Sequence, residues 1–152
     1  MSLVINTLIL FLFSINASLA SETVKIMNGR INEAPPAVKV HAGYLDIIND
    51  NEKEVELVSA SSPAFEKIEF HVTRIEQGVS SMHRQSKILI PAKSTFSFSP
   101  GEYHLMLFNN NRPVLEGDII PLVLVFSDGE NIRTGMHVIH IDPGEHNHHK
   151  DR

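Results

Sequence analysis

The chain has 152 residues, no cysteine and a formal net charge of −5 at pH 7. This length is typical of one domain. Without cysteine the chain has no disulfide framework, no cysteine for lipid attachment and no thiolate metal ligand. A blue-copper electron-transfer centre needs such a thiolate, so that class is excluded. The acidic balance includes no basic stripe, which argues against a nucleic-acid partner.

The first twenty residues have the features of an export signal. They contain no Lys, Arg, Asp or Glu, and the apolar run 8–13 is followed by small residues that end at Ala20. That order is typical of a signal peptide. An anchoring transmembrane helix is the alternative, but the apolar stretch is only about 17 residues and is broken by Asn and Ser, which is short for a span. We therefore expect a signal peptide over 1–20, export of the protein, a mature domain over 21–144 without stable membrane insertion, and a polar tail over 145–152.

The rest of the chain alternates between short apolar segments and turns. Polar or Pro- and Gly-containing turns lie at 49–53, 99–101 and 128–129. No segment sustains a 3.6-residue apolar period, so the pattern favours an all-β antiparallel sandwich or barrel of about nine strands. We expect a β-bulge near Gly43 and Tyr44. The predicted strands are 24–27, 38–48, 54–60, 65–75, 79–84 (short and ambiguous), 88–90, 95–98, 103–108, 119–126 and 134–141.

Two histidines and two methionines in the middle of the chain form the most informative motif. His71, Met82, His104 and Met106 are separated by ten, twenty-one and one residues. Thioether sulfur is a soft ligand that prefers Cu(I), and imidazole suits copper as well as zinc. Hard cations such as calcium would instead require carboxylate and carbonyl oxygens. The motif therefore predicts a copper site.

Strand geometry supports this prediction. Residues two apart in a strand point to the same side, so His104 and Met106 project together with Cα atoms about 6.5–7 Å apart. Alternation places His71 opposite Phe70, away from the apolar side, and Met82 follows a turn from which it could fold over the site. The alternative is that these methionines fill gaps in the core and these histidines are ordinary surface or hydrogen-bonded residues. His83 is a substitute for Met82, but adjacent strand residues point in opposite directions, so we do not favour it.

With these spacings the chain resembles the periplasmic PCuAC copper chaperones, whose signature is His-x10-Met-x21-His-x-Met. The similarity covers about residues 26–126 and includes Ala42-Gly43-Tyr44, Ala60-Ser61-Ser62-Pro63, Ile90-Pro91-Ala92, Pro100-Gly101-Glu102-Tyr103-His104-Leu105-Met106-Leu107 and Glu116-Gly117-Asp118-Ile119-Ile120-Pro121-Leu122. His41 and His83 fall where the family more often has other residue types.

The resemblance implies a single-domain, cupredoxin-like Greek-key β-sandwich. It implies that the protein binds Cu(I) at an exposed periplasmic site through His71, Met82, His104 and Met106 and then passes the ion on. We expect the protein to be a monomer. The implied recipient is the dinuclear copper centre of cytochrome c oxidase subunit II, reached directly or through a Sco-type thioredoxin-like protein.

The C-terminal segment is a second candidate metal site. Short His-rich tracts commonly bind metals, and imidazole with oxygen ligands suits Cu(II). The alternatives are a solvated polar tail or a purification tag. The candidate ligands are Met136, His137, His140, His146, His148 and His149.

Three other functional classes compete with a copper chaperone. One is a periplasmic copper or zinc buffer without a specific recipient. Another is an adhesion module in which the His and Met residues are incidental. An enzyme is the least favoured, because the sequence has no nucleophile–base spacing, no set-apart carboxylate pair and no Gly-rich phosphate loop.

Overall fold

The computed structural model describes residues 23–35 and 37–140, which form ten β-strands and no helix. Within these residues there is accordingly no helix long and apolar enough to cross a membrane. The predicted signal peptide and the tail from residue 145 lie outside the described residues. The strands are β1 Val24–Asn32, β2 Val40–Asn49, β3 Val55–Ser61, β4 Phe65–Glu76, β5 Val79–Gln85, β6 Ile88–Ile90, β7 Ser94–Phe98, β8 Tyr103–Asn110, β9 Ile119–Phe126 and β10 Asn131–Ile139.

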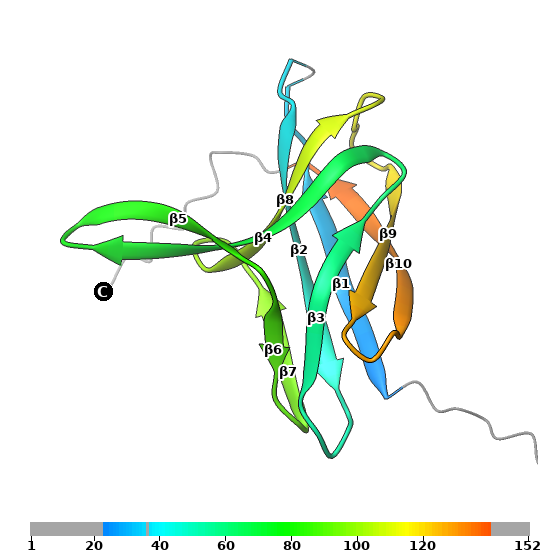
Figure 1. Ribbon diagram of the computed structural model, residues 1–152. Helices are drawn as coiled ribbons and strands as arrows, with labels where there is room; N and C mark the ends of the chain where they lie inside the picture. The colour runs from blue at the N-terminus through cyan, green and yellow to red at the C-terminus, as the bar shows by residue number, and fades with distance from the viewer. Residues whose placement is uncertain (1–22, 36, 141–152) are drawn as a thin grey trace, which may run out of the picture.

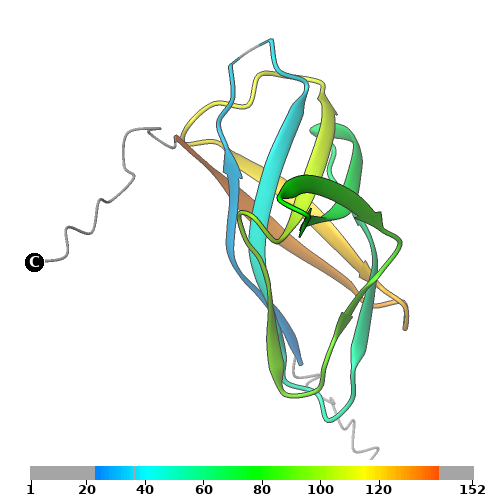
Figure 2. The same ribbon diagram turned by 90° about the vertical axis from the view of Figure 1, so that its left-hand side faces the viewer.

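The strands form one hydrogen-bonded sheet in the order β5-β4-β8-β2-β1-β10-β9-β3-β6, with β7 also paired to β2. The sheet curls so that β2, β8 and β4 face β3, β9 and β10 across the core (Figures 1 and 2). The all-β, cupredoxin-like sandwich is confirmed. One pair differs from the antiparallel prediction, because β1 runs parallel to β10. These strands come from opposite ends of the described chain, so no hairpin forces them to be antiparallel.

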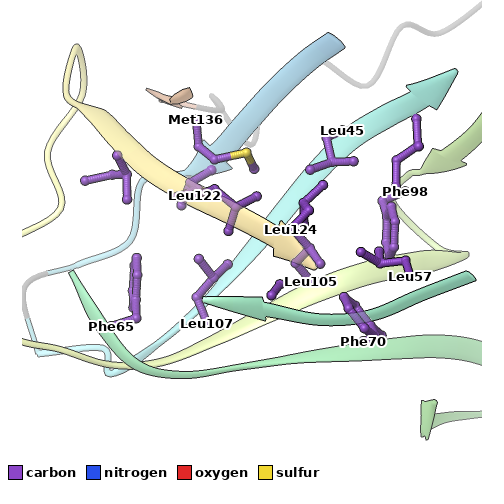
Figure 3. Close-up of a cluster of buried hydrophobic side chains, with 14 of the residues drawn as sticks. Leu45, Leu57, Phe65, Phe70, Phe98, Leu105, Leu107, Leu122, Leu124 and Met136 are labelled. Carbon is purple, nitrogen blue, oxygen red and sulfur yellow. The ribbon is translucent and has the colours of Figure 1, made fainter. Parts of the chain in front are cut away.

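The core lies between the two layers and is built from alternating positions of their strands. Figure 3 shows Leu105 and Leu107 of β8 facing Leu122 and Leu124 of β9, and each of these side chains is at most 1% exposed. Burying a leucine contributes about 1.5–3 kcal/mol relative to leaving it in water. Because these leucines fix which face of β8 points inward, His104 and Met106 must occupy the outer face.

The expected β-bulge lies on β1 instead of β2. The β1–β2 register slips between Met27 and Arg30, and Asn28 adopts a φ of 55° there. Asn tolerates this left-handed conformation better than most residues. Gly43 has a different role, because a Cβ at this position would lie 3.0 Å from Leu107 Cδ1. The glycine therefore permits close packing of β2 on β8.

Strand β4 is longer than the sandwich and carries a protruding hairpin. Its residues 65–72 pair with β8, whereas its last residues pair only with β5. Figure 1 shows this hairpin extending sideways from the body, and residues 74–80 are all exposed. The short, ambiguous segment predicted at 79–84 is β5, which is an edge strand of the sheet. The hairpin positions Met82.

Candidate metal centre

The strand register brings the four predicted ligands to one face of the sheet. His71 of β4 lies directly opposite His104 of β8, and Met106 follows two residues later on the same strand. Met82 of β5 lies opposite Thr73, which is two residues from His71. Directly opposed residues share a face, and so do residues two apart. All four side chains therefore project from the outer face of β5, β4 and β8.

The two imidazoles are neighbours whose ring centroids are 6.0 Å apart. The Nδ1 atom of His104 lies 3.1 Å from the backbone oxygen of Glu102. A carbonyl can only accept a hydrogen bond, so this nitrogen carries the proton and the Nε2 of His104 keeps its lone pair. Metal-ligating histidines commonly make such a bond through the nitrogen that does not bind the metal.

His71 is held through the other nitrogen. Its Nε2 lies 2.9 Å from Glu69 Oε2, and its Nδ1 is buried without a hydrogen-bond partner among residues 23–35 and 37–140. Most buried polar atoms in native proteins have a partner, so an orphaned nitrogen at this position needs an explanation. A metal ion that accepts its lone pair would supply one.

Burial differs sharply among the four predicted ligands. His104 is 7% exposed and the His71 side chain 13%, whereas Met82 is 62% exposed. The histidines are thus fixed within the sheet face, while the thioether of Met82 is open to solvent. The side of this face formed by the hairpin is therefore accessible to solvent.

The acidic residue beside the histidines is Glu69, which lies opposite Met106. The pKa of the Glu69 carboxyl is lowered, first by its hydrogen bond with His71 and next by its hydrogen bond with Lys67. Lys67 Nζ lies 3.1 Å from Glu69 Oε1, and Arg84 Nε lies 3.4 Å from the same oxygen. Sequence reasoning missed Glu69, although its position two residues before His71 on the same strand face was a usable signal.

The predicted donor set consists of two nitrogens and two sulfurs, all neutral, and such a set suits Cu(I) better than harder ions. Within residues 23–35 and 37–140, no three His, Cys, Asp or Glu side chains are grouped to hold a metal. A metal site on this face would therefore depend on its thioethers.

The structure separates His83 and His41 from this face. His83 lies opposite Val72 and so points to the other side of the hairpin. His41 lies opposite Leu107 on the inner face, is 4% exposed and packs edge-on against Phe65. The ring of His41 lines a separate pocket of about 310 Å³ near the start of β2. Neither histidine joins the predicted ligands.

Of the candidate C-terminal set, the structure describes only Met136, His137 and His140, and it does not bring these three side chains together. Met136 is fully buried in the core, where Figure 3 shows its sulfur near Leu122, whereas the adjacent His137 is exposed. The Nδ1 of His140 lies 3.0 Å from Glu33 Oε2. The remaining three histidines, His146, His148 and His149, lie outside the described residues.

The sequence model of the LpqE-like family, described as putative lipoprotein LpqE-like, matches residues 24–138. The chain belongs to this family. Over 89 residues, or 58% of the chain and 54% of the relative, it is 34% identical to a putative lipoprotein of Leifsonia xyli subsp. xyli. Over 103 residues, or 67% of the chain and 57% of the relative, it is 30% identical to an uncharacterized protein of Rickettsia prowazekii. The matches span little more than half the length of these relatives.

Solved structures share the fold. The copper-bound PCuAC domain from PmoF2 superposes with a TM-score of 0.67 at 18% identity, covering 78% of this chain and 94% of the domain. The solution structure of CuI-DR1885 from Deinococcus radiodurans superposes with a TM-score of 0.64 at 22% identity, covering 81% of this chain and 82% of that protein. At these identities the likeness shows the fold, which is that of PCuAC domains.

Proposed function

We propose that this LpqE-like protein is a Cu(I) metallochaperone that holds the ion through His71, Met82, His104 and Met106. One observation carries the proposal: the register places His71 opposite His104, with both thioethers on the same face. The orphaned Nδ1 of His71 supports it. So do the names of the two structural neighbours, one called copper-bound and the other called CuI.

Unequal burial of the ligands suits a carrier. The buried histidines would anchor the ion, while the exposed Met82 could leave as a recipient's ligand enters. In this exchange the bond between Cu(I) and the Met82 sulfur would break as a bond to the recipient's ligand forms, and no electron would be transferred. The hairpin that carries Met82 is open to an approaching partner (Figure 1). The transfer is ligand exchange, and no enzymatic turnover is proposed.

A Cu(I) titration against a competing chelator, without oxygen, tests the site. Met82→Leu and Met106→Leu keep the volume of the side chain and remove its sulfur. Each should weaken binding at least 10-fold, in line with the loss of one ligand. Met27→Leu is the matched control, because Met27 is 51% exposed on β1 away from the four residues. Equal affinity in all four proteins would refute thioether ligation.

We further propose delivery in the periplasm to the copper centre of cytochrome c oxidase subunit II, directly or through a Sco-type protein. The support is the resemblance described above and, for export, the lipoprotein name of the Leifsonia relative. A metal-tolerance buffer that holds copper or zinc has the same ligands but no recipient. The rate of copper transfer to a recipient distinguishes the chaperone from the buffer. A chaperone should load an apo oxidase domain faster than free Cu(I) does, whereas a buffer should slow that loading.

The His-rich C-terminus is proposed as a separate Cu(II) site. Its support is composition, with His146, His148 and His149 within four residues. The full chain and a chain ending at Gly144 should then differ in the amount of Cu(II) bound. Equal binding would leave the tail without a metal-binding role.

A further inference from the structure

We infer that Glu69 is a positioning residue that makes His71 bind copper through Nδ1, while His104 binds through Nε2. The inference rests on the proposed function for its ligand set and adds which nitrogen of each ring is used and which residue decides it. Its starting point is the short contact between Glu69 Oε2 and His71 Nε2, 2.9 Å, between side chains that are only 12% and 13% exposed.

The two contacts impose opposite tautomers on the two rings. An ionised carboxylate has no proton to donate, so the bond with Glu69 requires a proton on His71 Nε2. In the neutral ring Nδ1 then has a free lone pair, and this nitrogen is buried with no hydrogen-bond partner in the part of the chain that the structure describes. In His104 the carbonyl of Glu102 takes the Nδ1 proton and leaves Nε2 free. Each ring thus has one nitrogen free for the metal: Nδ1 in His71, because Glu69 binds Nε2, and Nε2 in His104, because the Glu102 carbonyl binds Nδ1.

Glu69 is itself held in place from two further sides. Lys67 and Arg84 both contact Oε1, at 3.1 and 3.4 Å, which leaves Oε2 for His71. The ammonium of Lys67 is in turn 4.5 Å from the centroid of the Phe108 ring. This support limits the positions that the carboxylate can take and therefore fixes the orientation of the His71 ring.

The charge of Glu69 is also suited to the ion. Four neutral ligands around Cu(I) leave the site with one net positive charge, next to side chains that are mostly buried. A carboxylate bonded to a ligand lowers the cost of holding that charge away from water and increases the basicity of the imidazole. Loss of such an outer partner typically weakens metal binding about 10–100-fold.

A competing arrangement makes the opposite prediction. If copper used His71 Nε2, Glu69 would occupy the ligand nitrogen and would have to be displaced. Removing the carboxylate would then strengthen binding. The sign of the effect of Glu69→Ala on Cu(I) affinity therefore separates a positioning role from competition.

Nitrogen-15 NMR of the histidine rings tests the tautomers without metal. In the apo protein, the neutral ring of His71 should carry its proton on Nε2 and the neutral ring of His104 should carry its proton on Nδ1. Glu69→Ala should convert His71 to a tautomer mixture and leave His104 unchanged. Glu69→Gln, whose amide oxygen can still accept from Nε2, should keep the wild-type tautomer. A wild-type His71 protonated on Nδ1 would overturn the inference.

Adding Cu(I) to the same samples completes the test. The metal should shift His71 Nδ1 and His104 Nε2, and Glu69→Ala should raise the dissociation constant at least 10-fold. Glu102→Ala is the control. The hydrogen bond to His104 uses the backbone oxygen of Glu102, which this substitution keeps, and the Glu102 side chain accepts its hydrogen bond from Ser99. Unchanged or tighter binding by Glu69→Ala would overturn the inference. Absence of Cu(I) binding in every protein, with the apo tautomers as expected, would instead refute the proposed function.

Discussion

At the scale of single residues, the same side chain serves different purposes according to its strand and face. Met82 is 62% exposed on the hairpin, Met106 is partly buried on the outer face, and Met136 is fully buried between the layers. A thioether can bind a soft metal or fill an irregular gap in a core. The sulfur of Met136 is so close to β1 that a Cβ on Gly29 would lie 2.9 Å from it. This methionine is therefore a packing residue.

Met136→Ala should lower the free energy of unfolding by about 2–5 kcal/mol, because it leaves a cavity in a core that cannot fully collapse. Its Cu(I) affinity in the folded state should match that of the wild type. Urea unfolding and chelator titration measure the two quantities. The surface control Met27→Ala should change stability by less than about 0.5 kcal/mol. A stable Met136→Ala with weakened copper binding would show that the buried sulfur acts as a ligand.

At the scale of elements, alternation predicts the faces of β4 and β8 correctly but does not identify the buried face of β2. In β4, Phe70 and Val72 point inward and His71 outward, as expected from the sequence. In β2 both faces contain apolar residues, and the buried face carries His41 and Asn49 along with Leu45 and Ile47. When both faces contain apolar residues, the period alone cannot say which one meets the core.

The β1 bulge is tied to β2 and β7 by a carboxylate, and this gives a prediction about acid. Asn28 Nδ2 donates to Asp46 Oδ2 at 2.6 Å, and hydrogen bonds from Ser97 first and Asn28 second lower the pKa of Asp46 below its ordinary value of 3.8. The folded state therefore favours the ionised carboxylate. The resulting stability is complete above the unfolded-state pKa and is lost as the pH falls through the lower folded-state value.

Urea unfolding at a series of pH values tests this. The difference in unfolding free energy between wild type and Asp46→Asn should be constant near neutral pH and should shrink below about pH 4. Ser97→Ala removes the donor with the largest effect on the Asp46 pKa. The folded-state pKa should then lie closer to the unfolded-state value, so the total loss of stability in acid should be smaller than in the wild type and should end at a higher pH. A difference that is independent of pH down to the acid limit would mean that Asp46 does not contribute through its charge.

At the scale of the whole molecule, one curled sheet carries a face that covers the core and a projecting hairpin. The histidines and Met106 lie where β4 and β8 cover the core, whereas Met82 lies on the part of β5 that extends beyond the sandwich (Figure 2 shows the hairpin facing the viewer). If all four predicted ligands bound one ion, the ion would connect the hairpin to the sandwich. Any ligand that binds only the folded state stabilises it in proportion to the logarithm of its concentration.

Thermal unfolding should therefore depend on copper. With free Cu(I) at 100 times the dissociation constant, the folded state should gain about 2.7 kcal/mol. At the same Cu(I) concentration, Met82→Leu should gain less, although its apo stability should equal that of the wild type because residue 82 is exposed. Scanning calorimetry with buffered Cu(I) measures both. An equal gain in the two proteins would show that Met82 does not contribute to the copper site.

The sequence by itself determined the all-β class, nearly all of the strands and the four candidate ligands. It could do so because strand alternation, turn residues and ligand chemistry are local properties of the chain. Tertiary structure decided the parallel pairing of β1 with β10, the placing of the bulge on β1, the burial of Met136 and the contact of Glu69 with His71. These depend on which strands meet and in what register. Register is set by packing between segments far apart in the chain, which no local pattern records.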